Sequence, residues 1–524
     1  MSARTVARTG LVVAGAFFVS RVLGWIRLVV ITNQFGASAE LDAYFAAFRL
    51  PDAIFQLVAA GAFGSAIIPV LAGLFSKNEE DRAWRVVSTV VNVMLLVLVV
   101  LASVLAIFAP QIVPLITPGF DAAGIELTVR LTRIMLISPV LLALAAVASS
   151  VLNVRGRFAA AALAPSLYNI AIICGALLLG PSLGVEGLAI GVVAGSLLHL
   201  GIQLRPLFRE RFRLSFKIET SDPAVRQILR LMAPRAVGLG ANQIIFMVAT
   251  MLASGVGLGA VTAYNVALTV MQIPLGVIGF PLGVALLPSL SHAVAAGSMR
   301  EFGSLVVRSL RMMLWIMLFI GAVGIVLRRQ GVALLFGYGL DEQAISLTAD
   351  TLSFLLLGLA AHAVVVVLKG AFYSNQDTRT PLLTALIDMI VAIGVGAATV
   401  GSLGLSGVAL GLSLGAWFEA AALGFLLWRR VPGAGLESVI RPLIVFLVGA
   451  VLAGLAALAI VRLTDPLVGT DPSVLGLLGQ VLAASAAAGF VYAVYTRLLR
   501  MPELDQSISL ARSLLRRGNR AGEA

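Results

Sequence analysis

Residues 183–196 read LGVEGLAIGVVAGS, and residues 403–416 read LGLSGVALGLSLGA. Six of these fourteen positions are identical at an offset of 220 residues, and most of the others exchange one small or apolar residue for another. Two further matches follow in the same order near this offset: GSAIIPVL (64–71) with GVALLPSL (283–290), and Asn153 and Arg157 with Asn375 and Arg379. Three ordered matches predict that one part of the chain duplicates another.

Apolar segments surround these repeats and fill most of the chain. The 524 residues are 60% hydrophobic and only 12% charged, about half the charged fraction of a soluble domain. Many apolar runs exceed the roughly 18 residues that cross a bilayer, and the roughly 10-residue alternating segments of a membrane barrel are absent. The sequence therefore predicts an all-α polytopic membrane protein, because lipid requires every backbone polar group to be satisfied internally. We expect about fourteen transmembrane helices, near 9–34, 41–75, 85–108, 127–152, 159–180, 185–206, 227–254, 262–296, 305–327, 346–373, 380–401, 405–428, 439–462 and 475–498.

The repeat predicts how these helices are organised. The offset carries spans 1–6 onto spans 7–12, and an even number of spans inserts both copies the same way up. We therefore expect two parallel-related six-helix lobes with a site between them, as in transporters that work by alternating access. The predicted boundaries are 1–217 for the N-terminal lobe, 218–432 for the C-terminal lobe, 433–500 for two additional C-terminal helices, and 501–524 for a basic cytoplasmic tail.

The net charge of +12 is explained by the positive-inside rule rather than by nucleic-acid binding. The odd-numbered connections at 35–41, 109–126, 181–185, 255–261 and 402–405 contain no Lys or Arg. The exceptions on that side are Arg328, Arg329 and Arg462, together with Arg130 and Arg133 near the outer end of span 4. This distribution predicts a bacterial inner-membrane protein with both termini in the cytoplasm. The even-numbered connections and the tail carry the basic residues Lys77, Arg82, Arg85, Arg205, Arg209, Arg211, Arg213, Lys217, Arg429, Arg430, Arg441, Arg512, Arg516, Arg517 and Arg520.

Catalytic and metal-binding patterns are absent from the sequence. Three histidines and one cysteine, Cys174 within an apolar run, exclude a disulfide scaffold and a cysteine-based metal site. We find no paired-carboxylate site, histidine cluster or nucleophile elbow. The sequence therefore predicts neither an enzyme nor a bound metal or cofactor.

Span 1 contains two arginines and no acid. Arg21 and Arg27 lie in the segment that starts at Ser20, and charges inside a span cost about 2.5–3.5 kcal/mol or more each. Arginine is suited to phosphate because its planar fork binds two oxygens and stays charged, so this pair indicates an anionic substrate. The two side chains project about 120° apart on a straight helix, and Gly24 is the expected hinge. The alternative for Arg27 is that it reaches the membrane interface.

Span 2 carries Asp42, Arg49, Pro51 and Asp52. Asp42 and Arg49 are seven residues apart on one helix face, and Arg49 and Asp52 are close enough in sequence to pair within the helix. A structural and a substrate-binding role are equally compatible with this pattern. Pro51 is expected to kink the helix.

Spans 7 and 8 are the repeat counterparts of spans 1 and 2 and also contain polar residues and prolines. Such interrupted helices in corresponding positions point to a binding site between the lobes. We therefore expect substrate contacts from these spans, with the alternative that Arg235 reaches back to the cytoplasmic headgroups. The candidate residues are Pro234, Arg235, Asn242, Gln243, Gln272 and Pro274, with the two prolines as hinges.

Other charged residues in the spans favour structural roles. His199 and Glu419 occupy equivalent repeat positions on spans 6 and 12, and we interpret both as packed residues in preference to a proton relay. Lys369 lies near a cytoplasmic span end and is interpreted as a topology determinant.

Several motifs together resemble the N-terminal signature of a known family: SRVLG (20–24) with Arg27, LDAYFAAFRLP (41–51), GAF (61–63) and Ile68-Pro69. Two more, PLGVIG (274–279) and LPSLS (287–291), resemble the eighth span of the same family. The family that these motifs resemble is the MurJ/MviN family of lipid II flippases.

The resemblance covers essentially the whole chain, including the repeat and the two additional spans. It implies membership of the multidrug/oligosaccharidyl-lipid/polysaccharide exporter superfamily. The implied substrate is lipid II, the undecaprenyl-diphosphate-linked peptidoglycan precursor, which moves from the inner to the outer leaflet for cell-wall synthesis. The resemblance also assigns Arg21 and Arg27 to a central cavity, Asp42 to a family acid, and spans 13–14 to a groove for the lipid tail.

The chain departs from the family pattern where further cavity charges are expected. Leu28 stands where an acid follows the second arginine, and Phe55 and Gln56 stand where an arginine is common. Ala60 replaces an acid and Thr269 replaces an arginine. Half of the expected cationic cavity is therefore missing.

We interpret the sequence as a flippase for a lipid-linked oligosaccharide, with lipid II as the expected substrate. Membrane lipids and proteins of cell-wall synthesis are the other expected partners. The alternatives are a related exporter of another polyprenyl-linked glycan or of a drug, and a membrane scaffold for cell-wall synthesis that transports nothing. The intramembrane arginines favour transport, because a scaffold need not keep costly charges in lipid. The sequence leaves open the energy source, the coupled ion and the oligomeric state.

Overall fold

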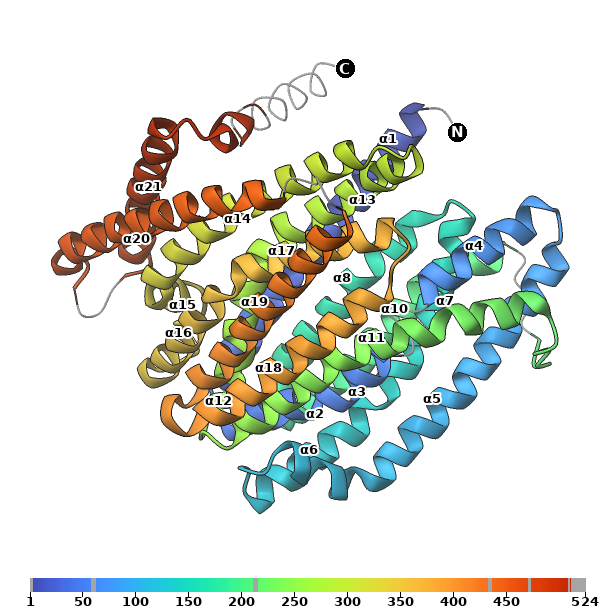
Figure 1. Ribbon diagram of the computed structural model, residues 1–524. Coiled ribbons are helices and arrows are strands. Elements are labelled where there is room, and N and C mark those ends of the chain that lie inside the picture. Colours follow the sequence, from blue (N-terminus) through green and yellow to red (C-terminus); the bar gives the residue numbers. More distant parts are fainter. Residues whose placement is uncertain are drawn as a thin grey trace. The chain divides into compact units, whose positions relative to one another are not determined.

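The computed structural model describes residues 3–57, 63–210, 215–431, 436–469, 473–507 and 509 (Figure 1). All regular elements within these residues are helices, so the predicted all-α fold is confirmed. The helices up to residue 254 are α1 (Ala3–Phe35), α2 (Ala39–Ala47), α3 (Arg49–Phe55), α4 (Phe63–Ser76), α5 (Glu80–Ile116), α6 (Ala122–Met135), α7 (Ile137–Val154), α8 (Phe158–Cys174), α9 (Gly180–Leu183), α10 (Val185–Arg209) and α11 (Pro223–Ser254). The later ones are α12 (Ala260–Pro274), α13 (Phe280–Ala295), α14 (Met299–Val326), α15 (Arg328–Phe336), α16 (Glu342–Leu357), α17 (Leu359–Ser374), α18 (Arg379–Leu403), α19 (Leu405–Arg430), α20 (Ile440–Val468) and α21 (Val474–Leu498).

The chain forms two compact units. The first comprises Met1–Asn265 together with Tyr338–Ala344, and the second comprises Val266–Gly337 together with Ile345–Ala524. The first unit therefore holds α1 to α11 and the start of α12, and the second holds most of the later helices.

Eleven helices in the described part of the chain are long and apolar enough to cross a membrane. The number becomes twelve when α16 and α17, which meet at an angle of 42°, are counted as one span. Two predicted spans, 41–75 and 227–254, are not among these twelve. Within them the structure has the shorter apolar helices Ile67–Ser76 and Gly240–Ser254. The chain is thus a polytopic membrane protein, and the count of fourteen stays a prediction.

Backbone details recur at the offset that the sequence repeat predicts. Gly184 begins α10 with φ 58° and ψ −141°, and Gly404 begins α19 with φ 57° and ψ −138°. A side chain would be strained at both positions because φ is positive. Asp121 accepts a hydrogen bond of 2.8 Å from the backbone N–H three residues later, and Asp341 does the same. Two glycine turns and two aspartate N-caps, each pair 220 residues apart, confirm the duplication.

One of the three sequence matches is wrong in register. The N–H of Arg157 bonds to the carbonyl of Leu152, and the same turn is made by Asp377 and the carbonyl of Phe372. The structural counterpart of Arg157 is therefore Asp377 and not Arg379. The identical Asn and Arg residues are 222 positions apart in the sequence, whereas the two structurally equivalent turns are 220 positions apart.

Two loops pack reciprocally against helix ends within the first unit. A Cβ atom added to Gly119 would collide with the backbone of Ser254 at the end of α11. One added to Gly339 would collide with the backbone of Asn33 in the last turns of α1. These glycines are also 220 residues apart, so each copy of the repeat supplies a loop to the first helix of the other. This exchange explains why residues 338–344 belong to the first unit.

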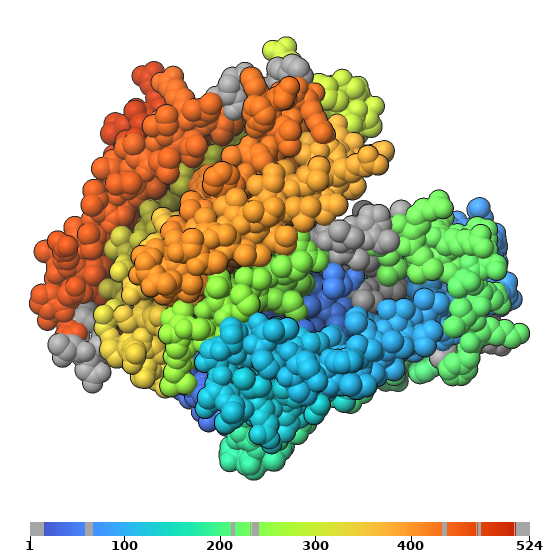
Figure 2. Space-filling model, turned by 60° about the horizontal axis from the view of Figure 1, so that its bottom comes forward, coloured from blue at the N-terminus to red at the C-terminus, as the bar shows by residue number. Residues whose placement is uncertain are grey.

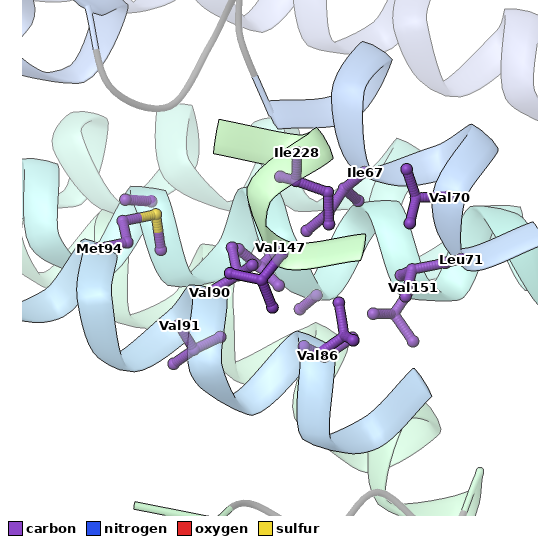
Figure 3. Packing of buried hydrophobic residues seen from close by; sticks show 14 of the residues in the cluster. Ile67, Val70, Leu71, Val86, Val90, Val91, Met94, Val147, Val151 and Ile228 are labelled. Atoms are coloured by element: carbon purple, nitrogen blue, oxygen red, sulfur yellow. The ribbon is translucent and has the colours of Figure 1, made fainter. Parts of the chain in front are cut away.

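A core of buried aliphatic side chains in the first unit lies between α4, α5, α7 and α11 (Figure 3). It consists of aliphatic side chains at helical spacing, such as Val86, Val90 and Met94 on α5 and Val147 and Val151 on α7. Farther along α5, which lies at the surface in Figure 2, apolar side chains such as Leu96 and Ile107 are exposed. A helix that is apolar on its outer face as well as its inner face is typical of a lipid environment.

The last two spans pack on α14 in the second unit. Small and aromatic side chains form this contact, including Ala457 on α20 and Ala488 and Tyr492 on α21. The ring of Tyr492 stacks on Phe319, with ring centroids 5.1 Å apart. The outer faces of both helices remain apolar and exposed, for example at Leu455 and Phe490.

Candidate functional site

The first element of the candidate site is a buried amide that holds an arginine of span 1. Helix α1 remains helical through Gly24 and packs against α8. Nη1 of Arg27 donates a hydrogen bond of 3.0 Å to Oδ1 of Asn169, and Nδ2 of Asn169 donates one of 3.2 Å to the carbonyl of Ser20. A Cβ atom at Gly24 would lie 3.8 Å from this amide, an ordinary contact distance, so Asn169 packs directly against α1 at Gly24. Asn169 thus orients Arg27.

Sequence reasoning missed Asn169, although a signal was present. It is a single amide within the apolar span 159–180, and the rule that flagged the span-1 arginines applies to it as well. Arg21 lies on the exposed part of α1, away from this contact. The structure therefore fixes Arg27 and leaves Arg21 facing the surroundings.

The second element is a break in span 2 that Pro51 produces. Proline has no N–H, so the carbonyl four residues earlier, that of Ala47, loses its helical partner. The hydroxyl of Thr132 on α6 donates to this carbonyl at 3.4 Å, and the helix divides into α2 and α3 at Phe48. The expected effect of Pro51 is an interruption supported by a neighbouring helix.

The break gives Asp42 and Arg49 different partners. Asp42 is buried, and its carboxylate accepts hydrogen bonds from the N–H of Gly259 at 2.8 Å and from the N–H and hydroxyl of Thr262 at 2.7 and 2.6 Å. Gly259 directly precedes α12 and Thr262 lies in its first turn, where backbone donors lack helical partners and the helix dipole attracts negative charge. Asp42 therefore caps α12 from α2.

Arg49 makes a second link between the same parts of the first unit. Its Nε donates to the hydroxyl of Thr250 on α11 at 2.8 Å, and its Nη2 donates to Oδ1 of Asn265 on α12 at 2.7 Å. The guanidinium also lies over the rings of Phe246 and Tyr264, at 5.7 and 6.0 Å from their centroids. We call Asp42, Arg49 and these partners the clamp, because they join span 2 to spans 7 and 8.

Arg49 and Asp52, which the spacing suggested as an intrahelical pair, interact through their charges, while the hydrogen bonds of Arg49 go to Thr250 and Asn265. Oδ1 of Asp52 accepts a hydrogen bond of 3.5 Å from Gln56, and the side chain of Gln243 also interacts with Asp52. Gln243 is buried on α11. The structure thus brings Gln243 to the clamp region, and its predicted contact with substrate stays a prediction.

The remaining predicted site residues are placed elsewhere. Asn242 and Gln272 lie on exposed faces of α11 and α12. Pro274 ends α12 at a π-helical turn, Leu275–Gly279, which is a common place for a helix to bend. The side chains of Pro234 and Arg235 lie outside the described residues, so their predicted roles stay predictions.

Where family members carry further positive charge, this chain has other contacts. Phe55 packs against the apolar core of the first unit, and Thr269 has an interaction of its own. Arg27 and Arg21, both on α1, are described arginines that take no part in the clamp. Guanidinium has five N–H donors, and Asn169 accepts one of them. This arrangement suits an oxyanion such as phosphate.

A duplicated set of apolar helices, interrupted spans and an arginine held by a buried amide define a polytopic membrane transporter. A family model described as "Lipid II flippase MurJ" matches residues 31–475. The chain belongs to this family.

Curated relatives agree over nearly the full length. The chain is 32% identical over 487 residues to a protein of Rhizobium meliloti (strain 1021) named "Probable lipid II flippase MurJ", covering 90% of this chain and 91% of that protein. It is also 32% identical over 432 residues to "Lipid II flippase MurJ" of Burkholderia cenocepacia, covering 81% and 84%. The family membership makes the chain a bacterial inner-membrane protein.

Solved structures show the same fold. "Lipid II flippase MurJ, inward closed conformation" superposes with a TM-score of 0.79 at 23% identity, over 93% of this chain and 99% of that chain. A multidrug resistance MATE family transporter of the MOP superfamily superposes with a TM-score of 0.66 at 18% identity, over 80% and 96%. The fold predicted from the repeat is confirmed by both.

Proposed function

We propose that this chain moves lipid II from the cytoplasmic to the outer leaflet by alternating access, for peptidoglycan synthesis. The observation that carries this proposal is Arg27, a charged side chain within a span, oriented by buried Asn169 in a member of the lipid II flippase family. An arginine in lipid is costly unless it serves a partner, and the diphosphate of lipid II is a suitable one.

The clamp supplies the proposed conformational step. It ties α2 and α3 to α11 and α12 through five hydrogen bonds. In our proposal it keeps the outer end of the first unit closed while Arg21 and Arg27 accept the diphosphate from the cytoplasmic side. Arg235 on span 7 is proposed to add charge to the same site. The clamp must open for the substrate to leave.

Spans 13 and 14 are proposed to hold the lipid tail. Helices α20 and α21 present apolar outer faces, and their inner faces pack on α14 through small side chains. Such surfaces suit a polyprenyl chain.

The test of the proposed function is growth of a bacterium whose own lipid II flippase is depleted. We expect the full chain to sustain growth and to move lipid II in reconstituted vesicles. A chain lacking residues 439–500 should insert its earlier spans and fail both assays. Growth support without lipid II movement would contradict the proposed substrate, and full activity of the shortened chain would contradict the proposed tail site.

We also propose that both termini face the cytoplasm, and single-cysteine labelling tests this orientation. Cys174 is the one cysteine of the sequence, so a Cys174→Ala chain provides the background. Cysteines at Ala37, Ala122 and Ser402 should react with an impermeant maleimide added outside, whereas cysteines at Asn78 and Arg211 should react only after the membrane is opened. The reversed pattern would overturn the orientation.

A further inference from the structure

Three charged side chains meet within the spans of the second unit, away from the clamp. Nζ of Lys369 on α17 lies 2.8 Å from Oε1 of Glu419 on α19. The Glu419 side chain is 4% exposed and that of Lys369 is 28% exposed. Lys369 is expected from its sequence position to be a topology determinant, and its side chain also reaches a buried carboxylate. We call Lys369, Glu419 and Asp388 the charged triad.

Packing places Asp388 beside this ion pair. A Cβ atom at Gly415 would collide with Oδ1 of Asp388, so the aspartate side chain lies against α19 at the glycine one turn before Glu419. One turn earlier on α18, the hydroxyl of Thr384 donates to Oε1 of Glu419 at 3.4 Å. The two carboxyl groups thus lie on adjoining turns of the neighbouring helices α18 and α19.

The charge of the triad is unbalanced. Two carboxylates face one ammonium group, which leaves one negative charge if both acids are ionised. Asp388 lies nine residues from the start of α18 at Arg379, or roughly 13 Å along the helix axis. An uncompensated charge at such a depth in an apolar environment is unfavourable, and a proton on one carboxyl group removes it.

The equivalent positions of the first unit carry no such charges. At the offset of 220, Asp388 corresponds to Tyr168, Glu419 to His199 and Lys369 to Ser149. Tyr168 packs edge-on against His199, with ring centroids 6.5 Å apart, and the hydroxyl of Ser149 donates to Gln203 at 2.7 Å. The same helix packing therefore forms with uncharged side chains, and the fold does not require the triad.

We propose that Asp388 and Glu419 share one exchangeable proton opposite Lys369, and that its binding and release couple transport to the proton gradient. The proton is taken from water on the outer side and released to water on the cytoplasmic side once per cycle. A metal cation is less suitable, because the Lys369 ammonium already occupies the cation position at Glu419. A further titratable group near the triad is His362, on α17, which interacts with the charge of Lys369. This inference rests on the proposed function, because it names the ion that drives the same transport.

The first experiment measures the distribution of lipid II between the leaflets of proteoliposomes under an imposed pH difference. For one proton per cycle, a difference of one pH unit, acidic outside, should shift the wild-type leaflet ratio about ten-fold. Asp388→Asn and Glu419→Gln should remove this shift. Glu186→Gln is the matched control, because Glu186 starts the equivalent helix α10 and pairs with Arg130 at the surface, at 2.9 Å; its response should equal that of the wild type.

A second measurement does not depend on transport. Infrared difference spectra of the purified protein, recorded between acidic and alkaline solution, should contain a protonated-carboxyl band that Asp388→Asn or Glu419→Gln removes and Glu186→Gln retains. A ten-fold shift that persists in both triad variants, a shift that follows a sodium gradient instead, or an unchanged carboxyl band would each overturn the proposed proton site. A wild-type protein that moves no lipid II would overturn the proposed function, and the infrared band would still decide the proton site.

Discussion

Arg27→Ala should abolish growth support in a flippase-depleted bacterium while the protein inserts at normal levels. Charge-assisted hydrogen bonds contribute about 1.5–3 kcal/mol each, so the loss of two bonds to a diphosphate corresponds to at least about 3 kcal/mol, or a roughly hundred-fold loss of affinity. Arg21→Ala should have the same effect, because its exposed guanidinium is proposed to bind the same group. The measurements are growth on depletion and lipid II binding by the purified protein.

Further variants separate charge from geometry. Arg27→Lys should be partly active, because the charge remains and the planar fork is lost. Asn169→Ala should be intermediate, since it removes the amide that orients Arg27. Arg133→Ala is the matched control, because this arginine is exposed on α6 and bonds to the carbonyl of Ala106. Normal growth with both Arg21→Ala and Arg27→Ala would show that the diphosphate is bound elsewhere.

The fold could be predicted because its signals are local or periodic. Apolar runs identify spans wherever they occur in the chain, and the repeat at 183–196 and 403–416 reports packing that is the same in both units. Gly184 and Gly404 illustrate this, since each begins a helix in the same positive-φ conformation. The number of spans was harder to predict than their positions, because the interrupted segment at 41–75 forms short helices instead of one long helix.

The site could be predicted only in part, because its partners are distant in sequence. Spacing suggested that Arg49 pairs with Asp52 three residues away, but Arg49 bonds to Thr250 and Asn265, about two hundred residues later. No local rule ranks such partners above a neighbour on the same helix. The partner of Lys369 was missed for the same reason, since Glu419 is fifty residues away on another helix.

Asp42→Ala should open the outer end of the first unit. Asp42 accepts three hydrogen bonds, two of them from backbone N–H groups at the start of α12. Unsatisfied buried donors cost about 1–3 kcal/mol each, so the closed state should lose at least about 3 kcal/mol, a roughly hundred-fold change in population. A cysteine at Ala263, which is buried next to Thr262, should then react far faster with an impermeant maleimide added outside.

The control for this prediction is Glu40→Ala, because Glu40 is an exposed acid in the first turn of the same helix. It should leave the reactivity of the cysteine at residue 263 unchanged, since it removes a carboxylate that does not cap α12. Asp42→Asn should fall between the two, because the amide oxygen still accepts a hydrogen bond and the charge that favours the α12 dipole is gone. Arg49→Met should reproduce the effect of Asp42→Ala, since it removes the second link to α11 and α12. Equal reactivity in Asp42→Ala, Arg49→Met and Glu40→Ala would show that the clamp does not hold this end closed.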